Sequence, residues 1–138
     1  MPADMVESFL KAVSIWASAQ PDILAVALVG SHARGGARAD SDIDLVLLVE
    51  DPAAYLSNAD WPKRFGRVVR RQVEPYGRVT SLRVWYDDGR EVEYGFTTAQ
   101  WAARPLDEGT RRVIRGGMRI LFERSPLFPP QAGGRPAA

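Results

Sequence analysis

The sequence predicts a single α/β (α+β) domain in which helices flank a small mixed β-sheet. Short apolar runs typical of buried strands alternate with amphipathic segments typical of helices. An Asp-Gly turn also joins two further strand-like segments. The length of 138 residues suits one domain, and hydrophobic residues make up 46% of the chain, enough for one core.

The first half of the chain predicts one helix and two buried strands. Residues 5–19 carry apolar side chains at three- and four-residue steps, which predicts an amphipathic helix, and Asp4 with Glu7 resembles a capping box. Residues 23–29 and 42–50 are apolar on both faces, so we expect both to be interior strands. A loop rich in Gly, Ala and Arg connects them.

The second half predicts a helical stretch interrupted by Pro62, a strand, a hairpin, a short helix capped by Thr98, a further helix and a last strand. These elements cover residues 53–66, 68–74, 78–86 with 91–97, the surroundings of Trp101, 107–115 and 118–122. Asp88-Gly89 suits the turn of the hairpin. We expect the domain to span residues 1–124 and the Pro/Gly-rich residues 125–138 to form a disordered tail.

Composition excludes several classes of protein. The formal net charge of +1 provides no general attraction to nucleic acid or to an anionic membrane. With no cysteine, the chain forms neither disulfides nor thiolate metal sites. The N-terminus lacks the basic start of a signal peptide, and the apolar run 23–29 is too short to span a bilayer. We expect a cytoplasmic protein that requires no membrane and no nucleic acid.

Two carboxylates at the start of the second strand are the first candidate site. Asp42 and Asp44 lie two positions apart, so their side chains point to one face of the sheet, with Cα atoms roughly 7 Å apart. Carboxylates so placed in an apolar strand repel each other and are costly to bury. A divalent cation removes both problems, and Mg²⁺ prefers carboxylate and phosphate oxygens. The alternative is a strand end that dips into solvent.

A second candidate site follows the first strand directly. Gly30 allows a bulky anion to approach the backbone, and the Ser31 hydroxyl can donate a hydrogen bond to a phosphate oxygen. Arg34 and Arg38 add positive charge nearby. A plain surface turn is the alternative. Neither a complete Walker motif nor G-x-G-x-x-G is present, so a P-loop and a dinucleotide-binding fold are not expected.

Together these residues resemble the nucleotidyltransferase superfamily related to DNA polymerase beta. The resemblance is greatest to its minimal (MNT-type) members and to the similar domain of aminoglycoside nucleotidyltransferases, and it covers about residues 5–123. The family pattern is a strand, Gly-Ser-x-Ala-Arg-Gly, a few residues, and Ser-Asp-x-Asp on the next strand. The matching residues here are Gly30, Ser31, Ala33, Arg34, Gly35, Ser41, Asp42 and Asp44.

The resemblance implies a third carboxylate from a later strand. Glu93 and Glu91 are both available on one face of the strand 91–97. Glu93 is flanked by Val92 and Tyr94 in mid-strand, where an unpaired charge has little reason to lie, whereas Glu91 lies beside the turn. We therefore favour Glu93 over Glu91.

The resemblance further implies the chemistry. Asp42, Asp44 and Glu93 would be the catalytic, metal-binding residues for two Mg²⁺ ions, and Gly30, Ser31, Arg34 and Ser41 would bind the phosphates of an NTP, with ATP favoured. Glu93 would also take the proton of the acceptor hydroxyl. The reaction would transfer NMP and release pyrophosphate.

The acceptor is not defined by the motif. Antibiotic-modifying relatives carry an additional helical domain, for which this chain has no length. We therefore expect a hydroxyl on a helical HEPN-type partner protein, with an antitoxin role, or else a pocket completed by a homodimer. Modification of an aminoglycoside or another small molecule, and a non-catalytic partner-binding module, are the alternatives.

Three other features are given structural interpretations. His32, the only histidine, is expected to be an exposed loop residue. Asp40 is expected to shape the turn before Ser41. The aromatic residues at positions 16, 85, 94 and 101 are expected to belong to the core or its rim.

Overall fold

The computed structural model describes residues 3–37, 41–58, 60–103 and 106–128. The elements in chain order are α1 (Ala3–Ser18), β1 (Ile23–Val29), β2 (Ile43–Val49), α2 (Pro52–Ser57), the 3-10 helix η1 (Trp61–Phe65), β3 (Val68–Tyr76), β4 (Val79–Tyr86), β5 (Glu91–Thr97), the 3-10 helix η2 (Ala99–Ala102), α3 (Glu108–Arg115) and β6 (Met118–Glu123).

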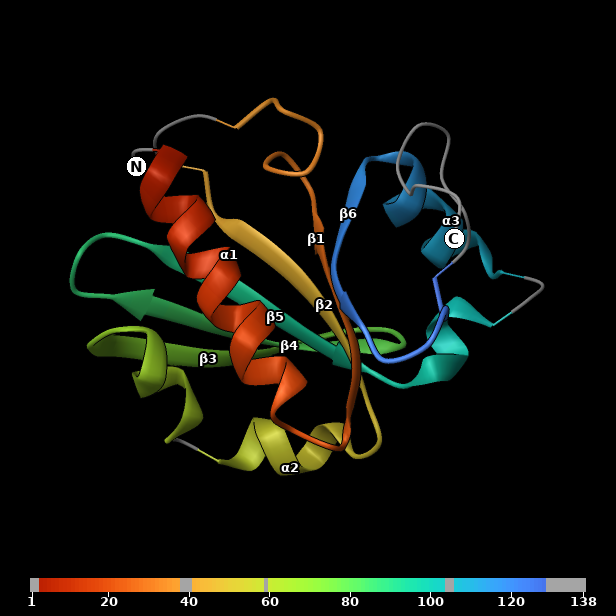
Figure 1. The fold of residues 1–138 in the computed structure, drawn as a ribbon, viewed down its shortest axis with the longest axis horizontal. Helices are drawn as coiled ribbons and strands as arrows, with labels where there is room; N and C mark the ends of the chain where they lie inside the picture. The colour runs from red at the N-terminus through yellow and green to blue at the C-terminus, as the bar shows by residue number, and fades with distance from the viewer. Residues whose placement is uncertain (1–2, 38–40, 59, 104–105, 129–138) are drawn as a thin grey trace.

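The six strands form one mixed sheet in the order β3-β4-β5-β2-β1-β6 (Figure 1). Every neighbouring pair is antiparallel except β2 and β5, which are parallel. The predicted α+β class with a small mixed sheet is therefore confirmed. The parallel pair lies at the centre of the sheet, so the two predicted strands that carry acidic residues are direct neighbours.

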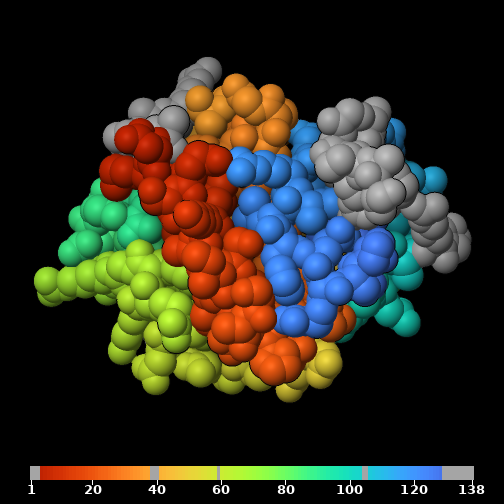
Figure 2. Space-filling view, viewed as in Figure 1, coloured from red at the N-terminus to blue at the C-terminus, as the bar shows by residue number. Residues whose placement is uncertain are grey.

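The two faces of the sheet are covered by different helices. On one face, α1, α2 and η1 pack their aromatic and aliphatic side chains on β2 and β5, and Trp16 stacks on Trp61 with ring centroids 5.3 Å apart. Figure 2 shows this side of the molecule, where α1 lies beside β6. On the other face, η2, α3 and Phe128 cover β1 and part of β2. This second face also carries the candidate site.

The alternation of side chains along β2 assigns each residue to one face. Ile43, Leu45 and Leu47 belong to the core under α1, whereas Val46 and Leu48 belong to the opposite core. By the same alternation, Asp44 lies on the face of Val46. Its strand is buried on both sides, so this carboxylate stands on a largely apolar surface.

Several boundaries differ from those predicted. The stretch 53–66 is divided into α2 and η1, and each begins with a proline at its first or second position, where the missing N–H is not needed. Asp4 lies within the first turn of α1 rather than before it, so it does not cap the helix from outside. A second tight hairpin joins β3 and β4 at Gly77, whose φ of 64° suits glycine.

Leu127 and Phe128, which follow the boundary predicted at residue 124, contact the rest of the domain. The backbone N–H groups of Leu127 and Phe128 each donate to Glu123 Oε2 at 2.9 Å, and the Phe128 ring packs edge-on against Trp101. The Phe128 side chain is 3% exposed, so its burial adds to the core on this face of the sheet. The remainder of the predicted tail, residues 129–138, lies outside the described residues. No helix among those described is both long and apolar enough to cross a bilayer.

Candidate active site

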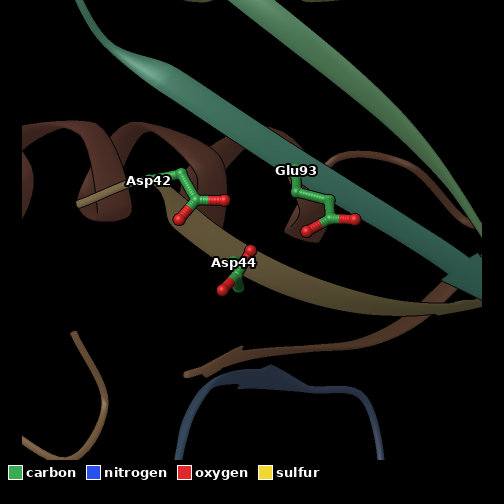
Figure 3. Close-up of side chains that lie close together, drawn as sticks. All are labelled: Asp42, Asp44 and Glu93. Carbon is green, nitrogen blue, oxygen red and sulfur yellow. The ribbon is translucent and has the colours of Figure 1, made fainter. Parts of the chain in front are cut away.

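Three carboxylates meet where the parallel strands begin. Asp42 directly precedes β2, Asp44 is its second residue and Glu93 lies on β5 (Figure 3). One oxygen from each lies within 4.8 Å of the others, and they form the one such acidic group in the described part of the chain. The structure thus brings together the three residues that the sequence singled out.

The strand register explains this meeting. Asp44 pairs with Glu93 across the parallel ladder, so the two side chains leave adjacent strands on the same face. Asp42 is two residues before Asp44 and shares that face. Glu91 is also on this face but pairs with the Arg83 guanidinium and lies outside the three-carboxylate group. The geometry therefore places Glu93 rather than Glu91 beside the aspartates.

Asp44 differs from the other two carboxylates because no ion pair to it is found in the described part of the chain, whereas Asp42 and Glu93 both pair with Arg83. Asp44 Oδ1 is buried and has no hydrogen-bond partner among the described residues. Burial, followed by hydrogen bonding with Glu93 and the charges of Asp42 and Glu93, raises the pKa of Asp44 to about 8, although Arg83 acts in the opposite direction. Without another cation, the surroundings of Asp44 therefore favour its protonated form far more than those of an ordinary carboxyl.

These residues fit a divalent cation. Three convergent carboxylates are the oxygen ligands that Mg²⁺ prefers, and a bound cation would satisfy the unpaired Oδ1 of Asp44. It would also remove the like-charge repulsion that raises the Asp44 pKa. Asp42, Asp44 and Glu93 are therefore the residues that can hold a metal here.

Arg83 of β4 lies among the same carboxylates, and the sequence analysis missed it. Its side chain is 16% exposed and donates to Asp42 and Glu74, while also pairing with Glu91 and Glu93. The hairpin register places Arg83 directly opposite Glu93. A three-residue loop, residues 87–89, sets this register, because the Tyr86 amide donates to the Arg90 carbonyl. A two-residue Asp-Gly turn would instead pair Arg83 with Tyr94, so the turn motif alone did not reveal the contact.

The turn after β1 supports Asp44 from the neighbouring strand. Gly30 has a φ of 76°, and a Cβ atom added to it would lie 2.6 Å from Asp44 Oδ2. Glycine is therefore needed both for the backbone conformation and for space. The Gly30 carbonyl accepts hydrogen bonds from the amides of Ala33 and Arg34, and the Ser31 carbonyl accepts one from Gly36, which closes the turn.

The remaining predicted phosphate-binding residues lie around this turn. His32 Nε2 lies 3.4 Å from the Ser41 carbonyl, which ties the turn to the residue before Asp42, so His32 is only partly exposed. The exposed Arg34 side chain donates to the Gly116 carbonyl at the end of α3, at 3.3 Å. Phosphate binding stays a prediction for the four residues to which it was assigned, namely Gly30, Ser31, Arg34 and Ser41. Arg38 and Asp40 lie outside the described residues.

A cavity of about 860 Å³ adjoins the carboxylates. Asp44 and Glu93 line it together with the sheet residues Val46, Ser81 and Gly95, and the far wall comes from Trp101 and the first turn of α3. Its volume falls within the roughly 300–1,000 Å³ typical of small-molecule sites. A ligand in this cavity would lie directly beside the candidate metal-binding residues.

The fold and the site together define a nucleotidyltransferase domain, which confirms the predicted superfamily. The sequence model of the family described as streptomycin adenylyltransferase matches residues 4–108, well over half of the chain. The chain therefore belongs to this family. A search of curated protein sequences gave no match.

One solved structure supports the fold assignment, and two others give weaker superpositions. An aminoglycoside 6-adenyltransferase from Bacillus subtilis superposes with a TM-score of 0.66 at 13% identity, covering 96% of this chain and 45% of that one. The chain thus spans less than half the length of that protein. The polymerase core of TRAMP, an RNA surveillance complex, gives a TM-score of 0.48 at 19% identity over 67% and 29% of the two chains. A CCA-adding enzyme gives 0.47 at 14% identity over 69% and 21%.

The contact between Gly30 and Asp44 can be tested with a matched pair of variants. Gly30→Ala and Gly35→Ala both place a side chain at a φ near 77°, but nothing lies within 4 Å of a Cβ at Gly35. We expect Gly30→Ala to lower the free energy of unfolding by at least about 1 kcal/mol more than Gly35→Ala, because only it displaces Asp44. Urea denaturation measures the difference. Equal losses would contradict the contact.

The raised pKa of Asp44 predicts a pH-dependent stability. Between the ordinary pKa of 3.8 and the folded value of about 8, the folded protein holds a proton that the unfolded chain has lost. The contribution of Asp44 to the free energy of unfolding of the metal-free protein should therefore fall as pH rises through this window, by about 1.4 kcal/mol for each unit by which its pKa is raised. Asp44→Asn should flatten this dependence in urea titrations at several pH values. Parallel curves for variant and wild type would refute the shift.

Proposed function

We propose that this protein is a Mg²⁺-dependent nucleotidyltransferase that transfers AMP from ATP to an acceptor hydroxyl and releases pyrophosphate. The observation that carries the proposal is the convergence of Asp42, Asp44 and Glu93, with an uncompensated buried oxygen on Asp44. A binding module has no need for three mutually repelling carboxylates, which are costly to assemble. The non-catalytic alternative is therefore the weaker one.

Each carboxylate has a distinct role in the proposed reaction. Asp42 and Asp44 would hold the metal that accompanies the triphosphate, and all three would hold a second ion near the acceptor. The ions, when bound, would neutralise charge on the phosphates and favour ionisation of the acceptor hydroxyl. Glu93 lines the cavity, and we assign to it the acceptance of the hydroxyl proton. The hydroxyl oxygen then forms a bond to the α-phosphorus, while the bond between the α-phosphorus and the pyrophosphate oxygen breaks and pyrophosphate leaves.

Phosphate binding is assigned to the turn after β1. Gly30 gives the triphosphate close access to the backbone, Ser31 and Ser41 offer hydroxyl donors, and Arg34 offers positive charge next to the turn. Arg34 would have to leave the Gly116 carbonyl to reach a phosphate, which its exposed position allows. ATP is favoured as the donor because the family is described as adenylyltransferases. The abundance of ATP in the cytoplasm fits the cytoplasmic location that we propose for the protein.

We infer a small hydroxylated molecule of the aminoglycoside class as the first acceptor to test. The cavity beside Glu93 has the volume of a small-molecule site, and the matched family is described by an antibiotic substrate. The predicted HEPN-type protein acceptor stays the second candidate. It does not depend on the cavity, because a hydroxyl on a protein surface could reach Glu93 from outside.

Transfer should depend on all three carboxylates. Purified protein is incubated with Mg²⁺, α-labelled ATP and either streptomycin-class aminoglycosides or a helical HEPN-type protein, and mass spectrometry detects added AMP. We expect Asp44→Asn and Glu93→Gln to reduce transfer by at least about a hundredfold, the usual contribution of such groups. Glu50→Gln, an exposed change beyond the end of β2, serves as the matched control.

The outcomes separate the candidates. Added AMP on an aminoglycoside supports the small-molecule acceptor, and added AMP on the protein alone supports the antitoxin role. Full activity of either carboxylate variant would contradict the catalytic assignment. Tight partner binding without any transfer would favour the non-catalytic module.

A further inference from the structure

The Arg83 guanidinium occupies oxygens of the proposed metal-binding residues. Its Nη1 lies 3.0 Å from Asp42 Oδ2, its Nη2 lies 3.3 Å from Glu93 Oε2, and its Nε donates to Glu74 Oε1 at 2.9 Å. Nη1 also contacts Glu91. Arg83 thus contacts two of the three candidate metal ligands, and leaves Asp44 without an ion pair in the described chain.

The sheet holds Arg83 in this position. β4 lies between β3 and β5, and Arg83 pairs with Glu93 on one side and with Gln72 on the other. A row of facing residues therefore crosses four strands in the order Asp44, Glu93, Arg83 and Gln72. Because the side chain is largely buried, its charge is weakly screened.

An arginine in this place has two opposed effects on the metal site. It keeps Asp42 and Glu93 together when no metal is bound, since it offsets their mutual repulsion. It also opposes metal binding, because a divalent ion must take carboxylate oxygens already paired with a cation that cannot lose its proton. Charges separated by such distances in a partly buried site interact strongly.

We propose that Arg83 is a positioning residue that acts as the internal counter-cation of the metal site, and that the metal must displace it from Asp42 and Glu93. This inference rests on the proposed function, since it takes these carboxylates as metal ligands. It follows that the protein alone binds divalent metal weakly. A triphosphate, which brings negative charge of its own, then strengthens metal binding, so the metal enters with the nucleotide.

Metal affinity tests this directly, without any enzymatic reaction. Mn²⁺ binding to metal-free protein is measured by electron paramagnetic resonance for the wild type, Arg83→Gln and Arg83→Lys. We expect Arg83→Gln to bind Mn²⁺ about tenfold or more tightly than the wild type, because one competing charge is gone. Arg83→Lys keeps the charge, so its affinity should stay near that of the wild type. An unreactive α,β-methylene ATP analogue should strengthen Mn²⁺ binding by a larger factor in the wild type than in Arg83→Gln.

Arg119→Gln is the matched control. Arg119 lies opposite Leu28 on the face of the sheet covered by α1, where it pairs with Glu7 at 2.9 Å. Because the carboxylates lie on the other face, its loss should leave Mn²⁺ affinity unchanged. Circular dichroism establishes that each variant is folded. If Arg83→Gln does not fold, the inference is still tested by the Mn²⁺ affinity of Arg83→Lys and by the effect of the analogue on the wild type.

The results that would overturn the inference are distinct from those that would overturn the proposed function. Unchanged or weaker Mn²⁺ binding in folded Arg83→Gln would show that Arg83 only organises the carboxylates. If only Arg83→Lys folds, a strong loss of Mn²⁺ binding in that variant would overturn the inference. A wild type whose Mn²⁺ affinity the analogue does not change would overturn it as well. Undiminished Mn²⁺ binding in Asp44→Asn would instead contradict the metal site itself.

Discussion

Repulsion among carboxylates at the start of the central parallel strands is the constraint on which the rest of the site depends. Pairing of β2 with β5 places Asp44 opposite Glu93, and Asp42 follows from the two-residue period of the strand. No arrangement of these strands in this register separates the acids. The neighbouring features, namely the guanidinium of Arg83 and the bare glycine at position 30, can each be understood as a response to it.

Gly30 and Arg83 respond in different ways. Gly30 gives the Asp44 carboxylate room, since any side chain there would meet Asp44 Oδ2. Arg83 neutralises charge on Asp42 and Glu93 but does not reach the buried Oδ1 of Asp44. The negative charge of the three carboxylates is thus only partly offset, because Asp44 Oδ1 has no partner in the described chain. A further cation is best accommodated beside that oxygen.

The opposite face of the sheet provides the stability that this arrangement needs. The aromatic cluster beneath α1, with Trp16, Trp61, Phe65 and Tyr94, anchors the same two strands from behind. Alternation along β2 and β5 assigns apolar side chains to that cluster and acidic ones to the site. The apolar packing under α1 therefore fixes the strand register, and this register brings the carboxylates together on the opposite face.

The sequence predicted what depends on short, local patterns. The strands, the Gly-Ser turn and the Asp-x-Asp pair are readable because period and spacing determine them, and Glu93 could be preferred to Glu91 from its mid-strand position. Arg83 was missed because its role arises from cross-strand register, and an isolated arginine in an alternating strand is usually solvated. Burial of Phe128 was missed for a related reason: it depends on a surface formed by η2, remote in sequence.

The central claim is that Asp42, Asp44 and Glu93 form one metal site. Anomalous X-ray diffraction from crystals grown with Mn²⁺ and the α,β-methylene ATP analogue tests it most directly. The account predicts an anomalous peak within ligand distance, roughly 2.0–2.3 Å, of oxygens from all three residues, with Arg83 moved away from Asp42 and Glu93. An Mn²⁺ peak elsewhere on the protein, with the Arg83 pairs intact and Asp44 Oδ1 still without a partner, would contradict it.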